Sequence, residues 1–200
     1  MPPKFDPKTE RRILKAAVRL WRAQGERGLT LRAVAREAGT TTPTVYRRFR
    51  DKQALRLALA EEFKQQLLAA CLSASSLEEI GRCYIRFAEQ HPNEYRLLWD
   101  SWNEVFHPEA PRPLRAWILS QLTNRFGGKP EDYLLFFYGL IFVWHGAAML
   151  LTVPGDDAAH QEVRTRFPLV AEAILQNARL FHDWESQRPE LPRVLNPQAD

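Results

Sequence analysis

The stretch "AGTTTPTVYRRF", residues 38–49, decides how this chain folds. Gly39 can adopt the left-handed conformation of a tight turn, and the residues after it predict a short helix with Thr42 as N-cap and Pro43 as its first residue. On that helix Val45 and Phe49 lie one turn apart on an apolar side. The opposite side is polar and carries Thr44, Arg47 and Arg48. The stretch therefore predicts a turn followed by a short helix with a cationic outer face.

Helix signals recur along the rest of the chain, and the predicted fold class is all-α. The first helix is expected to have Asp6 as N-cap, to begin at Pro7 and to stop at Gly25. Its apolar stripe consists of Ile13, Leu14, Ala17, Val18, Leu20 and Trp21. The second helix is expected between Thr30 and Gly39, with Leu31, Val34, Ala35 and Ala38 buried. These two helices and the one after Gly39 predict a compact three-helix unit.

A long fourth helix is expected after Asp51. Its apolar positions are Leu55, Leu59, Phe63 and Leu67. This helix would connect the N-terminal unit with the rest of the chain. Later helix starts are predicted at a capping box formed by Ser76 and Glu79, and at Pro92, Leu114, Pro130 and Pro168.

Charge is distributed unevenly along the 200 residues, although the net charge is only +4. Residues 1–50 contain 13 Lys or Arg against 4 Asp or Glu, which gives +9. The other 150 residues contain 15 against 20, which gives −5. A positive charge concentrated in one segment predicts a polyanionic partner for that segment.

The two cysteines, Cys71 and Cys83, fit neither a CxxC pair nor a disulfide framework, which favours the reducing cytoplasm. They are expected to be small buried apolar residues, and a redox-sensing pair is the alternative. The first twelve residues contain no apolar segment, so we expect no signal peptide.

Residues 133–153 form an apolar stretch of 21 residues without Asp, Glu, Lys or Arg, which is long enough for a membrane span. Gly139, His145 and Gly146 interrupt it, and neither flank is basic. We therefore expect a helix buried on all sides, covered by several partners that include a second subunit. The alternative is a helical protein held at a membrane by this stretch, with its basic N-terminal segment on anionic lipid.

A helix, a turn with glycine and a short helix with a polar outer face form a helix-turn-helix motif, whose second helix lies in the major groove of DNA. Hydroxyl and guanidinium groups on this part of the chain suit phosphate oxygens and base edges: Thr40, Thr41, Thr42, Arg47 and Arg48. Tyr46 is expected to bury its ring and to reach the backbone with its hydroxyl. A solvated surface helix is the alternative, and the +9 of residues 1–50 favours DNA.

Residues 28–63, "GLTLRAVAREAGTTTPTVYRRFRDKQALRLALAEEF", resemble the DNA-binding domain of TetR-type transcriptional regulators. The resemblance covers the motif and both flanking helices. It implies phosphate contacts from Thr30, Tyr46 and Lys52, and base or mixed contacts from Thr41, Thr42, Pro43, Thr44 and Arg47. Family members often carry histidine at the position of Arg48. DNA contacts of Arg48, Thr40 and Arg32 are expected from their chemistry.

The remainder of the chain resembles TetR-type ligand-binding domains more loosely, in its helix number and in "VWHG", residues 143–146, which is similar to a Trp-His-Gly signature of one subgroup. Its many aromatic residues suit either an ordinary core or a cavity for a flat apolar molecule. The candidate ligand site consists of Trp99, Trp102, Trp117, Phe137, Ile141, Trp144 and His145. His145 needs a hydrogen-bond partner, either as a core histidine or as a polar anchor for a ligand.

The helix expected from Pro130 has two different faces. Small and apolar residues on one face are candidates for a dimer interface, together with one residue of the helix expected near Pro168: Gly139, Val143, Gly146, Ala147, Leu150 and Ile174. The opposite face is expected to look into the subunit and carries Phe137, Ile141, Trp144, His145 and Ala148. These two helices would pair with their symmetry mates as a four-helix bundle.

Motifs of catalysis, metal binding and cofactor binding are missing from the sequence, so we expect no enzyme, no metal site and no cofactor. An all-helical enzyme that uses the aromatic residues remains the second alternative. We expect a helix-turn-helix domain over residues 1–52, a ligand-binding and dimerisation domain over 53–187, and a loose tail over 188–200. The predicted function is that of a cytoplasmic, homodimeric repressor that binds a pseudo-palindromic operator in double-stranded DNA and is released by a small apolar or aromatic effector.

Overall fold

The computed structural model describes residues 7–106, 111–155 and 157–187, so Asp6 and the predicted tail over residues 188–200 lie outside the described residues. Within these ranges the helices are joined by turns and loops and no strand is present, which confirms the all-α fold class. The helices are α1 (Pro7–Gln24), α2 (Leu31–Glu37), α3 (Thr42–Tyr46), α4 (Lys52–Leu72), α5 (Leu77–Gln90), α6 (Pro92–Asp100), α7 (Trp102–Val105), α8 (Pro113–Phe126), α9 (Leu134–Thr152), α10 (Asp157–Gln176) and α11 (Ala178–Ser186). Two 3₁₀ turns, η1 (Gly25–Arg27) and η2 (Pro130–Tyr133), follow α1 and precede α9.

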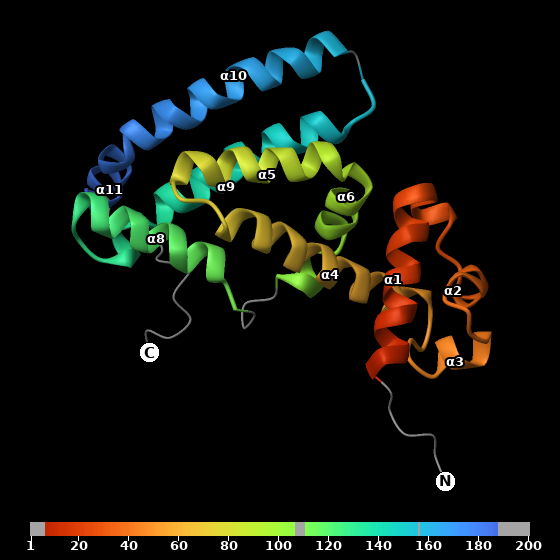
Figure 1. Ribbon diagram of the computed structural model, residues 1–200. Coiled ribbons are helices and arrows are strands. Elements are labelled where there is room, and N and C mark those ends of the chain that lie inside the picture. Colours follow the sequence, from red (N-terminus) through yellow and green to blue (C-terminus); the bar gives the residue numbers. More distant parts are fainter. Residues whose placement is uncertain (1–6, 107–110, 156, 188–200) are drawn as a thin grey trace.

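Helices α1, α2 and α3 form a small unit at one end of the molecule, and α4 runs from it into the rest of the chain (Figure 1). The unit has its own core, because Ile13, Val34, Val45 and Phe49 are buried between its helices. Gly39, in the turn before α3, has a φ of 60°, the left-handed conformation that the sequence predicts. Each helix of the unit therefore turns a polar face outward and an apolar face toward the shared core.

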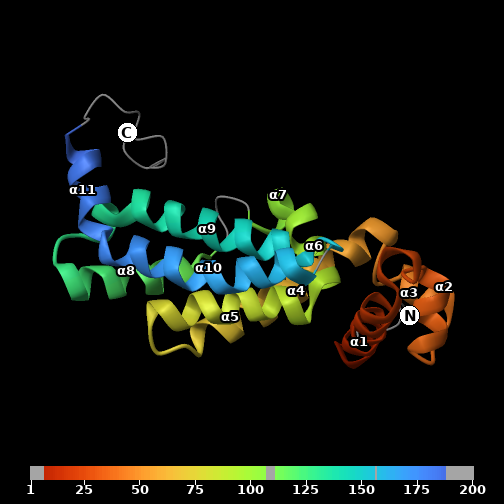
Figure 2. The ribbon, with the colours of Figure 1, turned by 90° about the horizontal axis from the view of Figure 1, so that it is seen from above.

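The body is built around α4, α5 and α9. Trp144 of α9 packs against Gly81 of α5 so closely that a Cβ at Gly81 would lie 2.9 Å from the indole nitrogen. The absence of a side chain at this position lets α5 and α9 approach each other. Helices α9 and α10 run side by side along one flank of the body (Figures 1 and 2).

The prediction of a helix starting near Pro168 is wrong, because Pro168 lies inside α10. The helix begins at Asp157, after Pro154 and Gly155, and buries Phe167, Ala171 and Leu175 at intervals of four residues. Proline removes one helical hydrogen bond, but packing of this apolar row favours a continuous helix.

Within the single chain the apolar helix is covered on one side only, so the predicted burial on all sides depends on a second subunit. Phe142 is 69% exposed and Leu150 is 58% exposed, while Phe136, Leu140 and Trp144 on the inner side are fully buried. By length and composition alone Pro130–Thr152 could cross a membrane, but its inner side packs against α5, α6, α8 and α10. The helix therefore has a covered side and an uncovered apolar side.

Candidate DNA-binding surface and effector site

The N-terminus of α3 is capped by Thr41, not by Thr42 as predicted. Thr41 has extended backbone angles, and its hydroxyl accepts a hydrogen bond from the backbone N–H of Thr44 at 3.4 Å. Thr42 is thus the first helical residue and Pro43 the second. The Thr41 and Thr44 hydroxyls lie 2.9 Å apart, and Arg47 donates to the Thr44 hydroxyl at 3.0 Å. These side chains form one connected polar face on α3.

The predicted DNA-binding residues differ in how far they are exposed to solvent. Thr30, Arg32, Thr41, Pro43 and Arg47 are exposed. Partial burial is found at Thr40, Thr42, Thr44, Arg48 and Lys52. The expected burial of the Tyr46 ring is wrong, since the residue is 54% exposed. The chain turns its ring outward because the inner side of α3 is already filled by Val45 and Phe49.

Thr30 and Lys52 stand at the starts of α2 and α4. The Thr30 hydroxyl caps α2 by accepting from the Ala33 N–H at 3.1 Å. The Lys52 ammonium lies 2.6 Å from the carboxylate of Glu26, which also approaches Arg56 at 3.5 Å. Because the Lys52 and Glu26 side chains are 43% and 47% exposed, their ion pair is weak and a DNA phosphate can compete with Glu26 for Lys52.

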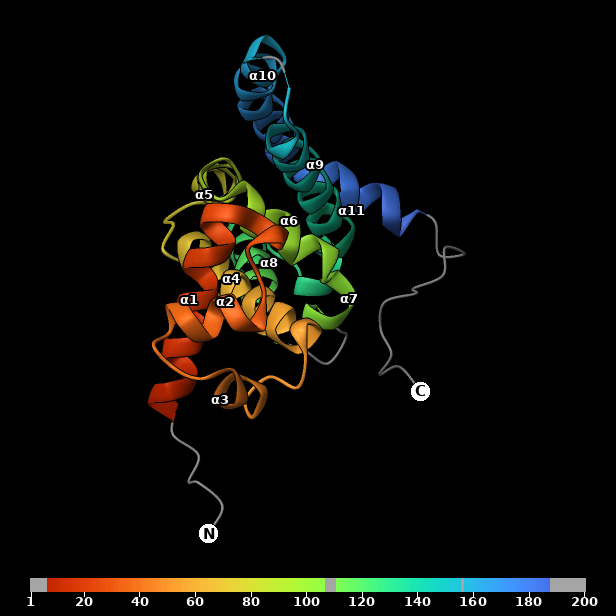
Figure 3. The ribbon, with the colours of Figure 1, turned by 90° about the vertical axis from the view of Figure 1, so that its right-hand side faces the viewer.

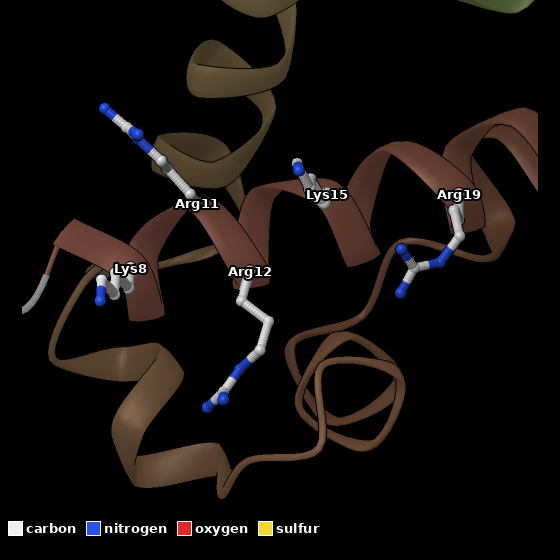
Figure 4. Close-up of a pocket in the computed structure, with 5 residues that line it drawn as sticks. All are labelled: Lys8, Arg11, Arg12, Lys15 and Arg19. Carbon is white, nitrogen blue, oxygen red and sulfur yellow. The ribbon is translucent and has the colours of Figure 1, made fainter.

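The sequence reasoning missed a row of cations on α1. Lys8, Arg11, Arg12, Lys15 and Arg19 line one surface hollow of about 310 Å³ (Figure 4). Arg19 pairs with Glu37 of α2 at 2.7 Å. The spacing of these five basic residues in the sequence places them on one helix face and would have revealed the row.

Three of the predicted ligand-binding residues come together at the junction of α6, α7 and α9. The indole rings of Trp99 and Trp102 are stacked with centroids 4.3 Å apart and planes 10° apart, and Phe106 stacks on Trp102 at 4.3 Å. The imidazole of His145 lies 3.9 Å from the Trp99 ring. We refer to Trp99, Trp102, Phe106 and His145 as the aromatic cluster. Trp102 is 40% exposed and closes the cluster on its solvent side.

A chain of buried polar groups continues from the aromatic cluster into the body. Nδ1 of His145 and the Tyr95 hydroxyl lie 2.8 Å apart, and the Tyr95 hydroxyl donates to the Tyr84 hydroxyl at 3.0 Å. Burial raises the pKa of both tyrosines and lowers the pKa of His145, which favours neutral forms of all three. The Trp99 indole N–H is buried and makes no hydrogen bond of regular geometry among the described residues, but it lies close to the hydroxyls of Tyr84 and Tyr95.

The other predicted ligand-binding residues are not part of this cluster. Trp144 is fully buried against Gly81 and Tyr84, and Phe137 is also a core residue. Trp117 and Ile141 are partly buried at the edge of the hydrophobic core, on α8 and α9. The predicted set is therefore divided between the aromatic cluster, the core and the edge of the core.

A second surface hollow, of about 320 Å³, lies between α4 and α5 and is lined by Gln66, Ala70, Ser73, Cys83, Arg86, Phe87, Gln90 and His91.

One buried charged side chain connects the body with α1, and another connects α7 with α4 inside the body. Glu94 of α6 is buried, with a side chain 4% exposed, and its carboxylate accepts from Arg22 of α1 at 2.7 Å and lies 3.3 Å from His91. Lys64 of α4 is also buried and donates to the Val105 carbonyl of α7 at 3.1 Å. Sequence reasoning could not find these pairs, because their partners are 72 and 41 residues apart.

The two cysteines are free, with Cys71 buried and Cys83 partly buried. Burial raises the pKa of the Cys71 thiol to about 12, so the thiol is protonated and unreactive at neutral pH. Within the described residues, no group of three His, Cys, Asp or Glu side chains is arranged to hold a metal ion.

Comparison with known proteins agrees with this geometry. Residues 13–59 match the family of bacterial regulatory proteins described as the tetR family. The fold is similar to TetR from Acinetobacter baumannii AYE, with a TM-score of 0.64, 19% identity, and coverage of 88% of this chain and 98% of that chain. A variant of that TetR in complex with minocycline has a TM-score of 0.62, 19% identity and coverage of 89% and 99%. A TetR-like transcriptional regulator from Rhodococcus sp. RHA1 has a TM-score of 0.54, 16% identity and coverage of 85% and 98%.

None of the curated proteins matches this chain. The family match spans α1 from Ile13, α2, α3 and the first part of α4, which are the elements that present the polar face of α3. The similarity in fold extends over the body as well. Residues 13–59 therefore match the tetR family of bacterial regulatory proteins, and the fold of the described chain is similar to that of TetR.

Proposed function

We propose that this regulator is a homodimeric, cytoplasmic repressor that leaves its operator when a small apolar or aromatic molecule binds the body. The observation that carries the proposal is the outer face of α3, on which Thr41, Thr44 and Arg47 are connected by hydrogen bonds above a buried apolar side. A short helix with this division of faces is suited to the major groove. In this proposal residues 1–52 form the DNA-binding domain, residues 53–187 bind the effector and the second subunit, and residues 188–200 form a tail.

The proposed DNA contacts fall into two groups. Base edges are read from α3 and the residues just before it, with Arg47 on guanine and the threonines on bases or phosphates. The phosphate backbone is held by Thr30 and Arg32 at α2, by Tyr46 and Arg48, and by Lys52 at the start of α4. The outward ring of Tyr46 supports its place in this second group.

The second subunit is proposed to cover the outer sides of α9 and α10. Leu150 and Phe142 of α9 and Leu169 and Val170 of α10 are exposed large apolar residues. Gly146 has open space where a Cβ would project, so another helix could approach there. Val143, Ala147 and Ile174 would complete the interface. We do not include Gly139 in the proposed interface, because a Cβ at this position would lie 3.4 Å from Phe181 of the same chain.

The effector is proposed to bind at the aromatic cluster. A flat aromatic molecule could replace the exposed ring of Trp102 against Trp99, and the Trp99 N–H, which makes no hydrogen bond of regular geometry, could then donate to an acceptor on that molecule. The A. baumannii TetR variant that shares this fold binds minocycline. The residues Val-Trp-His-Gly at 143–146 support the proposal that the body belongs to the subgroup of TetR-type ligand-binding domains with a Trp-His-Gly signature.

We further propose that α6 couples the effector to DNA. Adjacent residues of this helix face two ways: Tyr95 contacts His145 beside the aromatic cluster, and Glu94 holds Arg22 of α1. A shift of α6 would change the position of α1, and Lys64 offers a second connection from α7 to α4. The effector weakens DNA binding only as far as it prefers the shifted state.

The proposed function is tested by selecting genomic fragments on the purified protein and sequencing them. A pseudo-palindromic sequence should be enriched, and its retention should decrease steeply with salt. Retention of a single asymmetric half-site by a monomer would contradict the proposed dimer. Retention of no fragment at all would contradict the proposed repressor.

A further inference from the structure

Helix α1 presents a second cationic surface that the helix-turn-helix motif does not include. It carries six Lys or Arg against one Glu. Five of these cations, Lys8, Arg11, Arg12, Lys15 and Arg19, recur at helical spacing and line one hollow. We refer to these five residues as the α1 ridge. The sixth, Arg22, points elsewhere and pairs with Glu94.

The charge of the α1 ridge is largely uncompensated within the described residues. The lining of the hollow contains no Asp or Glu side chain. Among residues 7–106, 111–155 and 157–187, no carboxylate pairs with Arg11, Arg12 or Lys15, all of which are exposed. Like charges one turn apart on a helix repel one another, so such a row is stabilised when an anion lies along it.

The position of the α1 ridge relates it to the DNA-binding surface. The N-terminal end of α1 and helix α3 lie at the same end of the N-terminal unit (Figures 1 and 3). Arg12 and Arg19 extend on the side of α1 where α2 and α3 lie, and Arg11 and Lys15 extend on the other side (Figure 4). Arg12 and Arg19 therefore lie on the side of α1 that faces the helix-turn-helix motif.

We propose that the α1 ridge binds the phosphate backbone of DNA next to the groove that α3 occupies, so that each subunit holds a longer stretch of duplex than the helix-turn-helix motif alone would reach. This inference rests on the proposed DNA binding by α3. Two rows of cations along a helix suit consecutive phosphates, and such contacts strengthen binding without selecting sequence. A membrane surface fits less well, because the lining of the hollow contains no apolar side chain that could enter a bilayer.

The test compares two charge-reduced variants of the full chain on a random-sequence DNA duplex. The first variant, Arg12→Gln with Lys15→Gln, removes one cation from each row of the α1 ridge. The second, Arg82→Gln with Arg86→Gln, removes two exposed cations of α5 in the body and serves as the matched control. Glutamine keeps a high helix propensity in both variants. Dissociation constants are measured by fluorescence anisotropy over a salt series.

Each phosphate contact contributes about 0.9 to the slope of log affinity against log salt, so each lost contact reduces the fall in affinity between about 50 and 200 mM salt by about 3.5-fold. We expect the α1 ridge variant to show this smaller slope and the α5 control to retain the wild-type slope. Equal slopes for both variants would overturn the inference while leaving DNA binding by α3 intact.

A wild-type protein that binds no DNA would instead overturn the proposed function, and the inference with it. Vesicles of phosphatidylglycerol provide the last arm. Retention on these vesicles that depends on Arg12 and Lys15, with an unchanged salt slope on DNA, would assign the α1 ridge to lipid and contradict the inference.

Discussion

Arg47 and Lys52 occupy different environments, although both are cations near α3. Arg47 is held over α3 by its hydrogen bond to Thr44, whereas Lys52 sits at the start of α4 beside Glu26. We expect Arg47→Ala to cost about 1–3 kcal/mol of operator binding and to relax base preference at one position. Lys52→Ala should weaken operator and random-sequence DNA by the same factor. Gel shifts on the selected operator and its single-base variants measure both effects.

The control for these two variants is Lys129→Ala, which removes an exposed cation just before η2, in the body. It should leave affinity for all sequences nearly unchanged. If Arg47→Ala and Lys52→Ala both reduced affinity uniformly on every sequence, the division into base-reading and phosphate-holding residues would be wrong.

We expect the burial of His145 to make the stability of the body depend on pH. Burial lowers its pKa in the folded protein, whereas in the unfolded chain the imidazole takes a proton below about pH 6.5. Its contribution to stability is therefore full above that pH and is lost as pH falls from 6.5 toward the lowered folded-state pKa. We expect His145→Gln to lose less stability than wild type between pH 7.5 and 5.5 in urea titrations. Equal losses would show that His145 does not titrate in this way.

At the scale of elements, α6 joins the body to α1 through a buried carboxylate. Arg22→Gln would remove the charged partner of Glu94 and should lower the free energy of unfolding by about 1–3 kcal/mol. The exposed ion pair between Arg19 and Glu37 is the matched control, since Glu37→Gln should cost less than about 1 kcal/mol. Urea denaturation measures both values. A similar small loss for both variants would mean that Glu94 is satisfied without Arg22.

Local signals predicted the elements well where sequence neighbours determine them. The starts of α2, α4 and α5 follow from Thr30, Asp51 and Ser76, each of which accepts a hydrogen bond from the backbone N–H three residues later. The α3 cap was misplaced by one residue because two consecutive threonines have the same capping chemistry. The prediction of a helix start near Pro168 was wrong because the packing of α10 on α9 outweighs the local helix-breaking preference of proline.

The candidate site was only partly predictable for the same reason. The residues of the polar face of α3 lie close together in the chain, so they could be predicted from the sequence. In the aromatic cluster, Trp99 and His145 are 46 residues apart in the chain, and only the packing of α6 on α9 brings them together. Trp144, the neighbour of His145, faces α5 instead, because successive residues on a helix point about 100° apart.

For the whole molecule, Gly146→Leu tests the proposed dimer interface. The position has open space in the single chain, so the variant should fold normally while its added bulk separates the two subunits. We expect monomers in sedimentation velocity and a loss of operator binding. Ala116→Leu, at an exposed position of α8, adds bulk elsewhere and should remain dimeric. An unaltered dimer for Gly146→Leu would place the interface on another surface.

The response to an effector also involves the whole molecule, because the proposed effector site lies in the body and the DNA-binding surface in the N-terminal unit. Trp102→Ala should weaken the release of DNA by an aromatic effector while preserving operator binding, because Trp102 is exposed and far in sequence from α3. Trp144→Ala is a poorer probe than the sequence indicated, since truncating this fully buried ring should cost about 3–5 kcal/mol of stability. Operator-bound protein titrated with effector measures the response. A Trp102→Ala protein with an unchanged response would place the effector elsewhere.

The uncovered apolar side of α9 and α10 has a consequence for how sharply the regulator responds to its own abundance. In the proposed dimer only the paired form presents two recognition helices, so dimer formation and operator occupancy are linked by mass action. Below the dimer dissociation constant, the concentration of the active form rises with the square of the total protein concentration. A twofold increase in synthesis would then raise the active form about fourfold, and the genes under its control would respond to cell growth or dilution with a threshold.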